Sequence, residues 1–131
     1  AIGISKVDAV DAMCTPLESV VDMTHAEVLG PVFAIVSRYT IQTHASVYAN
    51  TARHLNIATT GDDHRDAMTL IERVETLARQ ANIALYFTHF QLTEQQAGQL
   101  ATQALQSASM PLNPRSLTHE EISSLYLQMV N

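Results

Sequence analysis

The stretch 8-DAVDAMCTPLESVVDMTH-25 has the pattern of a two-sided helix that leads to a histidine. Apolar residues recur at intervals of three and four, which places them on one side of a helix; they are Val7, Val10, Cys14, Leu17 and Val21. Acids and a hydroxyl follow the same spacing on the other side and lead toward His25; they are Asp11, Thr15, Glu18 and Asp22. Any chemistry in this chain is therefore first sought on this polar face.

Composition and charge limit the class of protein and its partners. The 131 residues are 47% hydrophobic and 15% charged, with four glycines and four prolines, which is typical of one globular domain. The formal net charge is −6, and the seven lysines and arginines are scattered singly. Because binding to a phosphate backbone needs clustered cations, we expect no nucleic-acid partner.

The single cysteine and the hydropathy pattern indicate the compartment. Cys14 lies on the apolar side of the first helix, where it is expected to be a small buried hydrophobe, and one cysteine allows no internal disulfide. No apolar run approaches the ~20 residues that cross a bilayer, and the first twenty residues carry acids, unlike a signal peptide. We therefore expect a cytoplasmic protein with no membrane partner.

The first part of the chain contains two helix breakers. Ser5 and Asp8 resemble a helix-start signal, and the helix they begin is predicted to run to about Met23, with a kink or break at Pro16. Gly30-Pro31 is predicted to interrupt the chain again, ahead of a buried central helix over residues 32–39.

Capping boxes and periodicity define the remaining helices. A Ser or Thr followed three residues later by Glu or Gln starts a helix, and this signal occurs at Thr24/Glu27, Thr93/Gln96 and Thr118/Glu121. Further helices are predicted near residues 47–56 and 63–82, the latter with a solvated charged side formed by Arg65, Glu72, Arg73, Glu75 and Arg79. Residues 83–92 have no partner strand and are read as a packed connection. The prediction is an all-α fold, a compact bundle of six or seven helices in a single domain, residues 1–131.

The C-terminal sequence NPRSLTHEEISSLYLQMV, after a helix rich in Ala and Leu, resembles the end of iron-containing alcohol dehydrogenases, in the wider group that includes dehydroquinate synthase and glycerol dehydrogenase. That family carries an HxxxHPxG motif followed ten residues after its second His by HGxxNA. Here DAMCTPLE (Asp11–Glu18) and HAEVLG (His25–Gly30) lie at these motifs with the same interval. The resemblance covers nearly the whole chain and implies the helical C-terminal domain of the family, the dehydroquinate synthase-like α domain.

The resemblance also shows which family features this sequence lacks. The nucleotide-binding domain with its glycine-rich loop has no counterpart in the 131 residues, nor does the earlier helix that supplies Asp and His to the metal. The paired histidines of the first motif are replaced by Asp11 and Thr15, and only His25 of the later motif is retained. The resemblance therefore implies at most half of the family's metal site.

Two interpretations of the polar face stay open. His25 and Asp11 are candidate metal ligands, which suit Fe or Zn, although such sites usually have three or four protein ligands. The alternative is a helix-start His25, favoured as the neutral imidazole, that hydrogen-bonds a nearby acid. Likewise Thr15, Glu18 and Asp22 either line a small-molecule pocket or form the solvated side of the helix. The sequence requires no cofactor beyond this possible divalent metal.

Two functions follow from the altered metal motifs. The first is a stand-alone, catalytically inactive helical domain that acts as a binding or interaction module, with no catalytic residue. It is expected to form a homodimer that covers the apolar run Val28–Tyr39. The second is a fragment or subunit of a metal-dependent alcohol dehydrogenase, an NAD(P)-linked oxidoreductase that retains a partial metal site.

Overall fold

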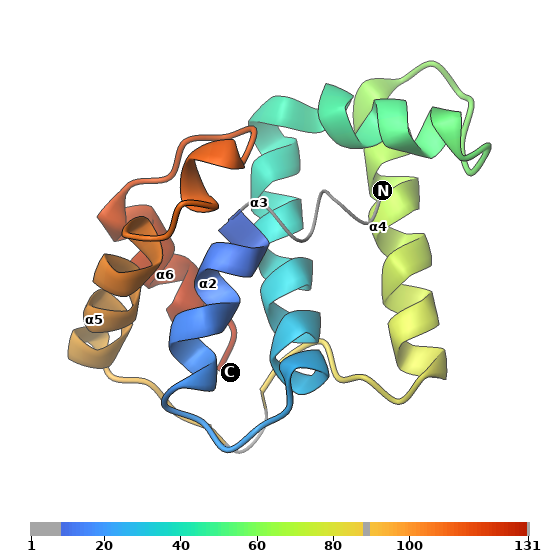
Figure 1. Cartoon of the computed structure of the whole chain (residues 1–131). Coiled ribbons are helices and arrows are strands. Elements are labelled where there is room, and N and C mark those ends of the chain that lie inside the picture. Colours follow the sequence, from blue (N-terminus) through green and yellow to red (C-terminus); the bar gives the residue numbers. More distant parts are fainter. Residues whose placement is uncertain (1–8, 88–89, 131) are drawn as a thin grey trace.

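The fold is entirely helical in the residues that the computed structural model describes, 9–87 and 90–130. Five α-helices and one short 3₁₀ helix follow in the order α2 (Ala9–Glu18), α3 (His25–His54), α4 (Asp63–Gln80), α5 (Glu94–Leu105), η1 (Met110–Leu112) and α6 (His119–Gln128). Figure 1 shows α3 in the centre, with α2, α5 and α6 on one side and α4 on the other. The predicted all-α class is confirmed, and the number of α-helices is slightly lower than six or seven.

The predicted helix starts are confirmed by the cap geometry. All three capping boxes are formed, with Thr24, Thr93 and Thr118 as N-caps whose hydroxyls accept from the third backbone N–H of the helix. The predicted helix ends near residues 56 and 82 are confirmed to within two residues. The helix start predicted at Ser5 and Asp8 lies outside the described residues.

The predicted extent of the first helix is wrong. Helix α2 contains Pro16 without a break but ends at Glu18 rather than near Met23. Because Pro16 has no N–H, it removes a backbone bond from the last turn. The chain then tightens, with the N–H groups of Val20 and Val21 both donating to the carbonyl of Leu17.

The interruption predicted at Gly30-Pro31 is also wrong. Helix α3 continues through both residues and joins the helices predicted over residues 32–39 and 47–56 into one element. Its only non-helical backbone angles are at His44 (φ −132°, ψ 43°), between those two predicted helices. Packing explains the continuity, since a β-carbon at Gly30 would overlap the carbonyl oxygen of Ala84. Glycine therefore permits a close approach of the 83–85 backbone, and this tertiary contact outweighs the low helix propensity of the pair.

The buried apolar side chains form two clusters. The larger joins α2, α5 and α6 to the first part of α3, and we call this region the packed half. The smaller joins the second part of α3 to α4 around Ile41, Tyr48 and Ile71, and we call this region the open half. As predicted, Cys14 is buried, in the packed half. None of the helices in the described part of the chain has the length and hydropathy to span a bilayer.

Candidate functional site

The polar face of α2 lies next to the start of α3, but its side chains have separate partners. His25 Nδ1 lies 2.9 Å from a carboxylate oxygen of Glu18, and this pair joins the end of α2 to the first turn of α3. Asp11 accepts a hydrogen bond of 3.0 Å from the hydroxyl of Ser109, just before η1. The structure thus pairs His25 with Glu18, whereas Asp11 is held by another element.

The predicted metal ligands have no third partner in the described structure. Within residues 9–87 and 90–130, no three His, Cys, Asp or Glu side chains come close enough together to hold a metal ion. The donor set present in this part of the chain therefore does not fit a site of three or four protein ligands. Metal binding at His25 and Asp11 stays a prediction.

The three residues of the predicted pocket do not share a cavity. Thr15 is exposed and lines a hollow of about 420 Å³ between α2 and α5, together with Ala12, Pro16, Ser19, Gln103, Gln106 and Ser107. Glu18 is not part of its lining, and Asp22 is exposed in the turn between α2 and α3. A small-molecule site at Thr15, Glu18 and Asp22 stays a prediction.

A cavity that was not predicted from the sequence lies on the other side of α3. It has a volume of about 540 Å³, is partly open to solvent, and is lined by both parts of α3, by α4 and by the connection after α4. We call it the α3–α4 cavity; its lining includes Leu29, Phe33, Leu55, Leu70, Leu77 and Ile83. A volume of this size, mostly apolar walls and few polar groups are typical of small-molecule sites.

Two asparagines end the helices α3 and α4 beside the α3–α4 cavity. Asn56 (φ 57°) and Asn82 (φ 62°) adopt left-handed backbone conformations directly after α3 and α4. In each case the next residue, an isoleucine, donates its N–H to a carbonyl in the last turn, at 2.9 Å for Ile57 and 2.8 Å for Ile83. This helix-ending geometry returns the chain over the helix end, so both isoleucines line the cavity.

Ion pairs hold α4 beside α3 without filling the space between them. Arg38 on α3 donates two hydrogen bonds to Glu75 on α4, at 3.0 and 2.6 Å, and Glu75 is only 4% exposed. The prediction that Glu75 belongs to a solvated face is therefore wrong, because sequence periodicity does not reveal a charged partner on another helix. The hydrogen bonds from Glu75 raise the pKa of Arg38 above its usual range.

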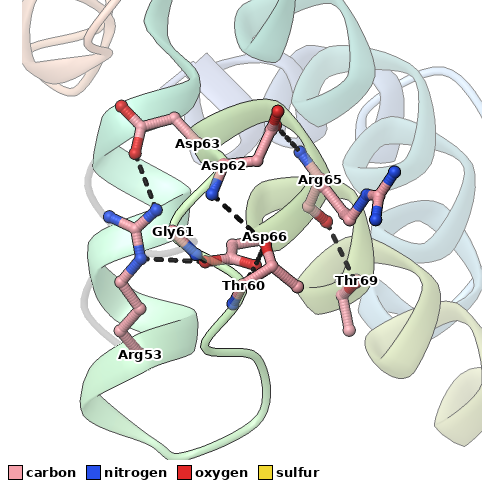
Figure 2. Close-up of polar contacts among 8 residues, drawn as sticks. All are labelled: Arg53, Thr60, Gly61, Asp62, Asp63, Arg65, Asp66 and Thr69. Atoms are coloured by element: carbon pink, nitrogen blue, oxygen red, sulfur yellow. Dashed lines mark hydrogen bonds and ion pairs between the residues drawn. The ribbon is translucent and has the colours of Figure 1, made fainter.

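Asp66 fixes the loop between α3 and α4 (Figure 2). Its carboxylate is fully buried and accepts from the hydroxyl and N–H of Thr60, at 2.6 and 3.1 Å, and from Arg53 Nε at 2.9 Å. The Thr60 hydroxyl is the largest cause that lowers the pKa of Asp66 to about 2, with Arg53 acting in the same direction. This cluster is structural, since its charges are satisfied internally.

The C-terminal sequence that carries the family resemblance is also structural in this fold. Arg115 lies 3.8 Å from the centre of the Tyr39 ring and donates to the Tyr39 carbonyl at 2.8 Å. The Tyr39 hydroxyl donates to Glu121, which lowers the pKa of that carboxyl. The NPRSL segment therefore attaches α6 to the centre of α3, and its presence predicts fold rather than catalysis.

These features define an all-helical protein in the part of the chain that the structure describes. A model of the C-terminal domain of the Fe-containing alcohol dehydrogenase family matches residues 1–130, and the chain belongs to this family. The fold is also similar to the crystal structure of a 1,3-propanediol oxidoreductase, with a TM-score of 0.77 and 22% sequence identity over 93% of this chain. No curated protein sequence matches the chain significantly.

The chain spans about a third of the 1,3-propanediol oxidoreductase, since the match covers 32% of that chain. At 22% identity the likeness defines the fold alone. The family membership confirms the predicted resemblance, and the activity of the whole enzyme is not carried over with it.

Proposed function

We propose that this chain is a catalytically inactive helical domain of the Fe-containing alcohol dehydrogenase family that acts as a binding module. The observation that carries the proposal is the α3–α4 cavity, about 540 Å³ of mainly apolar space between two helices that the Arg38–Glu75 pair joins. Two points support inactivity. Thr15 replaces a histidine of the family motif, and the remaining candidate ligands Asp11 and His25 have separate partners.

A direct test measures whether the chain oxidises an alcohol when metal and cofactor are added. The purified chain is incubated with Fe²⁺ or Zn²⁺, NAD⁺ or NADP⁺, and 1,3-propanediol, and reduced cofactor is followed by absorbance at pH 7. The expected result is no turnover above the protein-free control. Turnover that is lost in His25→Ala and retained in His64→Ala, an exposed histidine of α4, would contradict the proposal.

The second candidate is a part of a metal-dependent alcohol dehydrogenase, an NAD(P)-linked oxidoreductase. It is favoured by the adjacency of α2 and the start of α3, which brings Glu18 within 2.9 Å of His25. In this case Glu18, Asp22 or a second copy of the chain would supply the further metal ligands. This candidate predicts about one tightly bound Fe or Zn per chain, lost in His25→Ala; a metal-free protein that gains no thermal stability from either ion excludes it.

Self-association stays a prediction, and less apolar surface is left to be covered by a second copy than the sequence suggested. Val28, Val32 and Val36 of the apolar run are buried within the packed half, and only part of the run, including Leu29 and Phe33, faces the α3–α4 cavity. Sedimentation velocity at micromolar concentration measures the oligomeric state. A monomer at all concentrations would contradict the predicted dimer. It would not affect the proposal that the chain is a binding module, since that proposal rests on the α3–α4 cavity.

A further inference from the structure

We infer that the α3–α4 cavity binds a small amphipathic anion, a molecule with an unbranched or compact apolar body and one carboxylate or similar acidic group. This inference rests on the proposed function, since it names the ligand class of the binding module. It assigns the apolar body to the space between Phe33 and Leu77, and the acidic group to Arg73 on the cavity wall.

The shape of the cavity favours a small molecule over a long polypeptide segment. Helices α3 and α4 form two walls, Leu55 directly after α3 and Ile83 in the connection after α4 also line the cavity, and part of it is open to solvent. The lining of α4 extends from Leu70 to Ala78, which at 1.5 Å per residue is about 12 Å. Such a space matches a ligand of roughly ten heavy atoms, whereas a docked helix of more than about eight residues would extend beyond it.

The cavity offers few hydrogen-bond partners to water. Among the described residues, the polar or charged side chains of its lining are Thr51, Tyr48 and Arg73, and the hydroxyl of Thr51 donates to the carbonyl of Val47 at 3.2 Å. Ordered water needs two to four polar partners at each position. An apolar body would also cover Leu77 and Leu55, which are 56% and 45% exposed.

Charge determines which end group the ligand carries. Among the described residues, Arg73 is the only charged residue in the lining, and its side chain is exposed. Like Arg65 and Arg79 it makes no ion pair with another described residue, whereas Arg38, Arg53 and Arg115 have carboxylate partners. The nearest buried acid on its helix, Glu75, is already bound by Arg38. In a chain of net charge −6, an unmatched guanidinium beside an apolar cavity favours an anionic partner.

The walls are fixed before any ligand binds. The Arg38–Glu75 pair holds α4 to α3, the Asp66 cluster holds the upper loop, and the contact of Gly30 with Ala84 holds the connection below. These contacts join each wall to its neighbour by residues that do not line the cavity, except Gly30. A preformed cavity lowers the entropic cost of binding.

Isothermal titration calorimetry with three ten-carbon probes tests the inference. Decanoate, decan-1-ol and decyltrimethylammonium share one apolar body and differ in charge, and all are used below their critical micelle concentrations. Decanoate is expected to bind one per chain, roughly three- to tenfold more tightly than decan-1-ol, because Arg73 is partly solvated. Decyltrimethylammonium is expected to bind more weakly than either.

Two variants with matched controls locate the site. Arg73→Gln is expected to remove the preference for decanoate and to leave decan-1-ol binding unchanged; Arg65→Gln, on the same helix outside the lining, changes neither. Leu77→Glu is expected to abolish binding of both probes, whereas Leu112→Glu, at a site 61% exposed on η1, does not.

Three results would overturn the inference: no binding of decanoate, binding that is unaffected by Leu77→Glu, or equal affinity of wild type for all three probes. A dimer that Leu77→Glu dissociates would assign the cavity to a second copy instead. These binding results do not test dehydrogenase activity. Failure of the inference is therefore distinguishable from failure of the proposed function, which is tested by metal content and by turnover of the alcohol.

Discussion

The packed half and the open half are stabilised by different interactions. In α2, seven of ten residues are buried, and none of the seven is charged. In α4, five of eighteen residues are buried, and two of these are the carboxylates Asp66 and Glu75. Apolar burial therefore dominates the attachment of α2 to α3. The attachment of α4 combines the apolar cluster around Ile41, Tyr48 and Ile71 with charge-assisted hydrogen bonds from Arg38 and Arg53.

This difference explains why the cavity lies in the open half. Apolar surfaces gain free energy by leaving water, and those of the packed half close on each other. A bidentate Arg–carboxylate pair instead fixes a separation between two helices. Arg38 and Glu75 thereby keep α4 beside α3 while Leu77 and Leu55 stay partly exposed.

The largest expected difference between the halves is in leucine truncation. Leu17→Ala, at a fully buried site in α2, is expected to lower the free energy of unfolding by about 3 kcal/mol, through lost burial and the space left behind. Leu77→Ala, at a site 56% exposed in α4, is expected to change it by less than about 0.5 kcal/mol. Urea unfolding followed by circular dichroism measures both, and equal effects would show that the open half is packed like the other.

Breaking the ion pair of the open half is expected to have a smaller effect. Arg38→Gln leaves Glu75 buried without its cation and is expected to cost about 2 kcal/mol, less than for a fully buried pair because Arg38 is 43% exposed on its side chain. The double variant Arg38→Gln/Glu75→Gln is expected to recover part of this loss. Thermal unfolding monitors the series, and an additive double variant would argue against coupling between the two residues.

Acid is expected to release the open half first. The pKa of Asp66 is about 2 in the folded state, below its usual 3.8, so its contribution to stability is complete above about pH 4 and is lost as the pH falls toward 2. Amide hydrogen exchange between pH 5 and 2 should therefore show protection lost in α4 before α6. In Asp66→Asn this difference in pH dependence should shrink; an unchanged profile would mean that another group controls the acid transition.

The smallest expected effect concerns a long-range side-chain hydrogen bond between α6 and α2. The Tyr126 hydroxyl is buried and donates to the carbonyl of Met13 at 2.7 Å, and burial raises its pKa far above the usual range. Tyr126→Phe is expected to cost about 1 kcal/mol with no change in probe binding at the α3–α4 cavity. Weaker decanoate binding in this variant would show that the two halves are coupled.

Much of the fold was predictable because its signals are local. A capping box such as Thr24/Glu27 satisfies backbone groups within four residues, so the sequence alone reveals where a helix starts. The Gly30-Pro31 break was predicted wrongly because the close contact with Ala84 comes from a residue more than fifty positions away. The helix ends near residues 56 and 82 were predicted to within two residues, whereas the end of α2 at Glu18 was not predicted.

The candidate site was less predictable for the same reason. The sequence placed His25 near an acid, and the structure identifies that acid as Glu18 at 2.9 Å. It did not reveal the α3–α4 cavity, because Leu77 and Val74 have the spacing of ordinary core residues. The neighbouring Arg73 also lines the cavity. An arginine on a helix surface is too common to indicate a binding site when the neighbouring helices are not known.

The sequence by itself determined the helical class, the family resemblance and the helix starts, all of which depend on residue spacing and local hydrogen bonds. Only the tertiary structure decided which apolar helix faces pack together and which line the α3–α4 cavity. That outcome depends on Arg38 reaching Glu75 across 37 positions and on Gly30 admitting the 84 backbone. Packing between distant segments is a property of three-dimensional distance, which spacing along the chain does not encode.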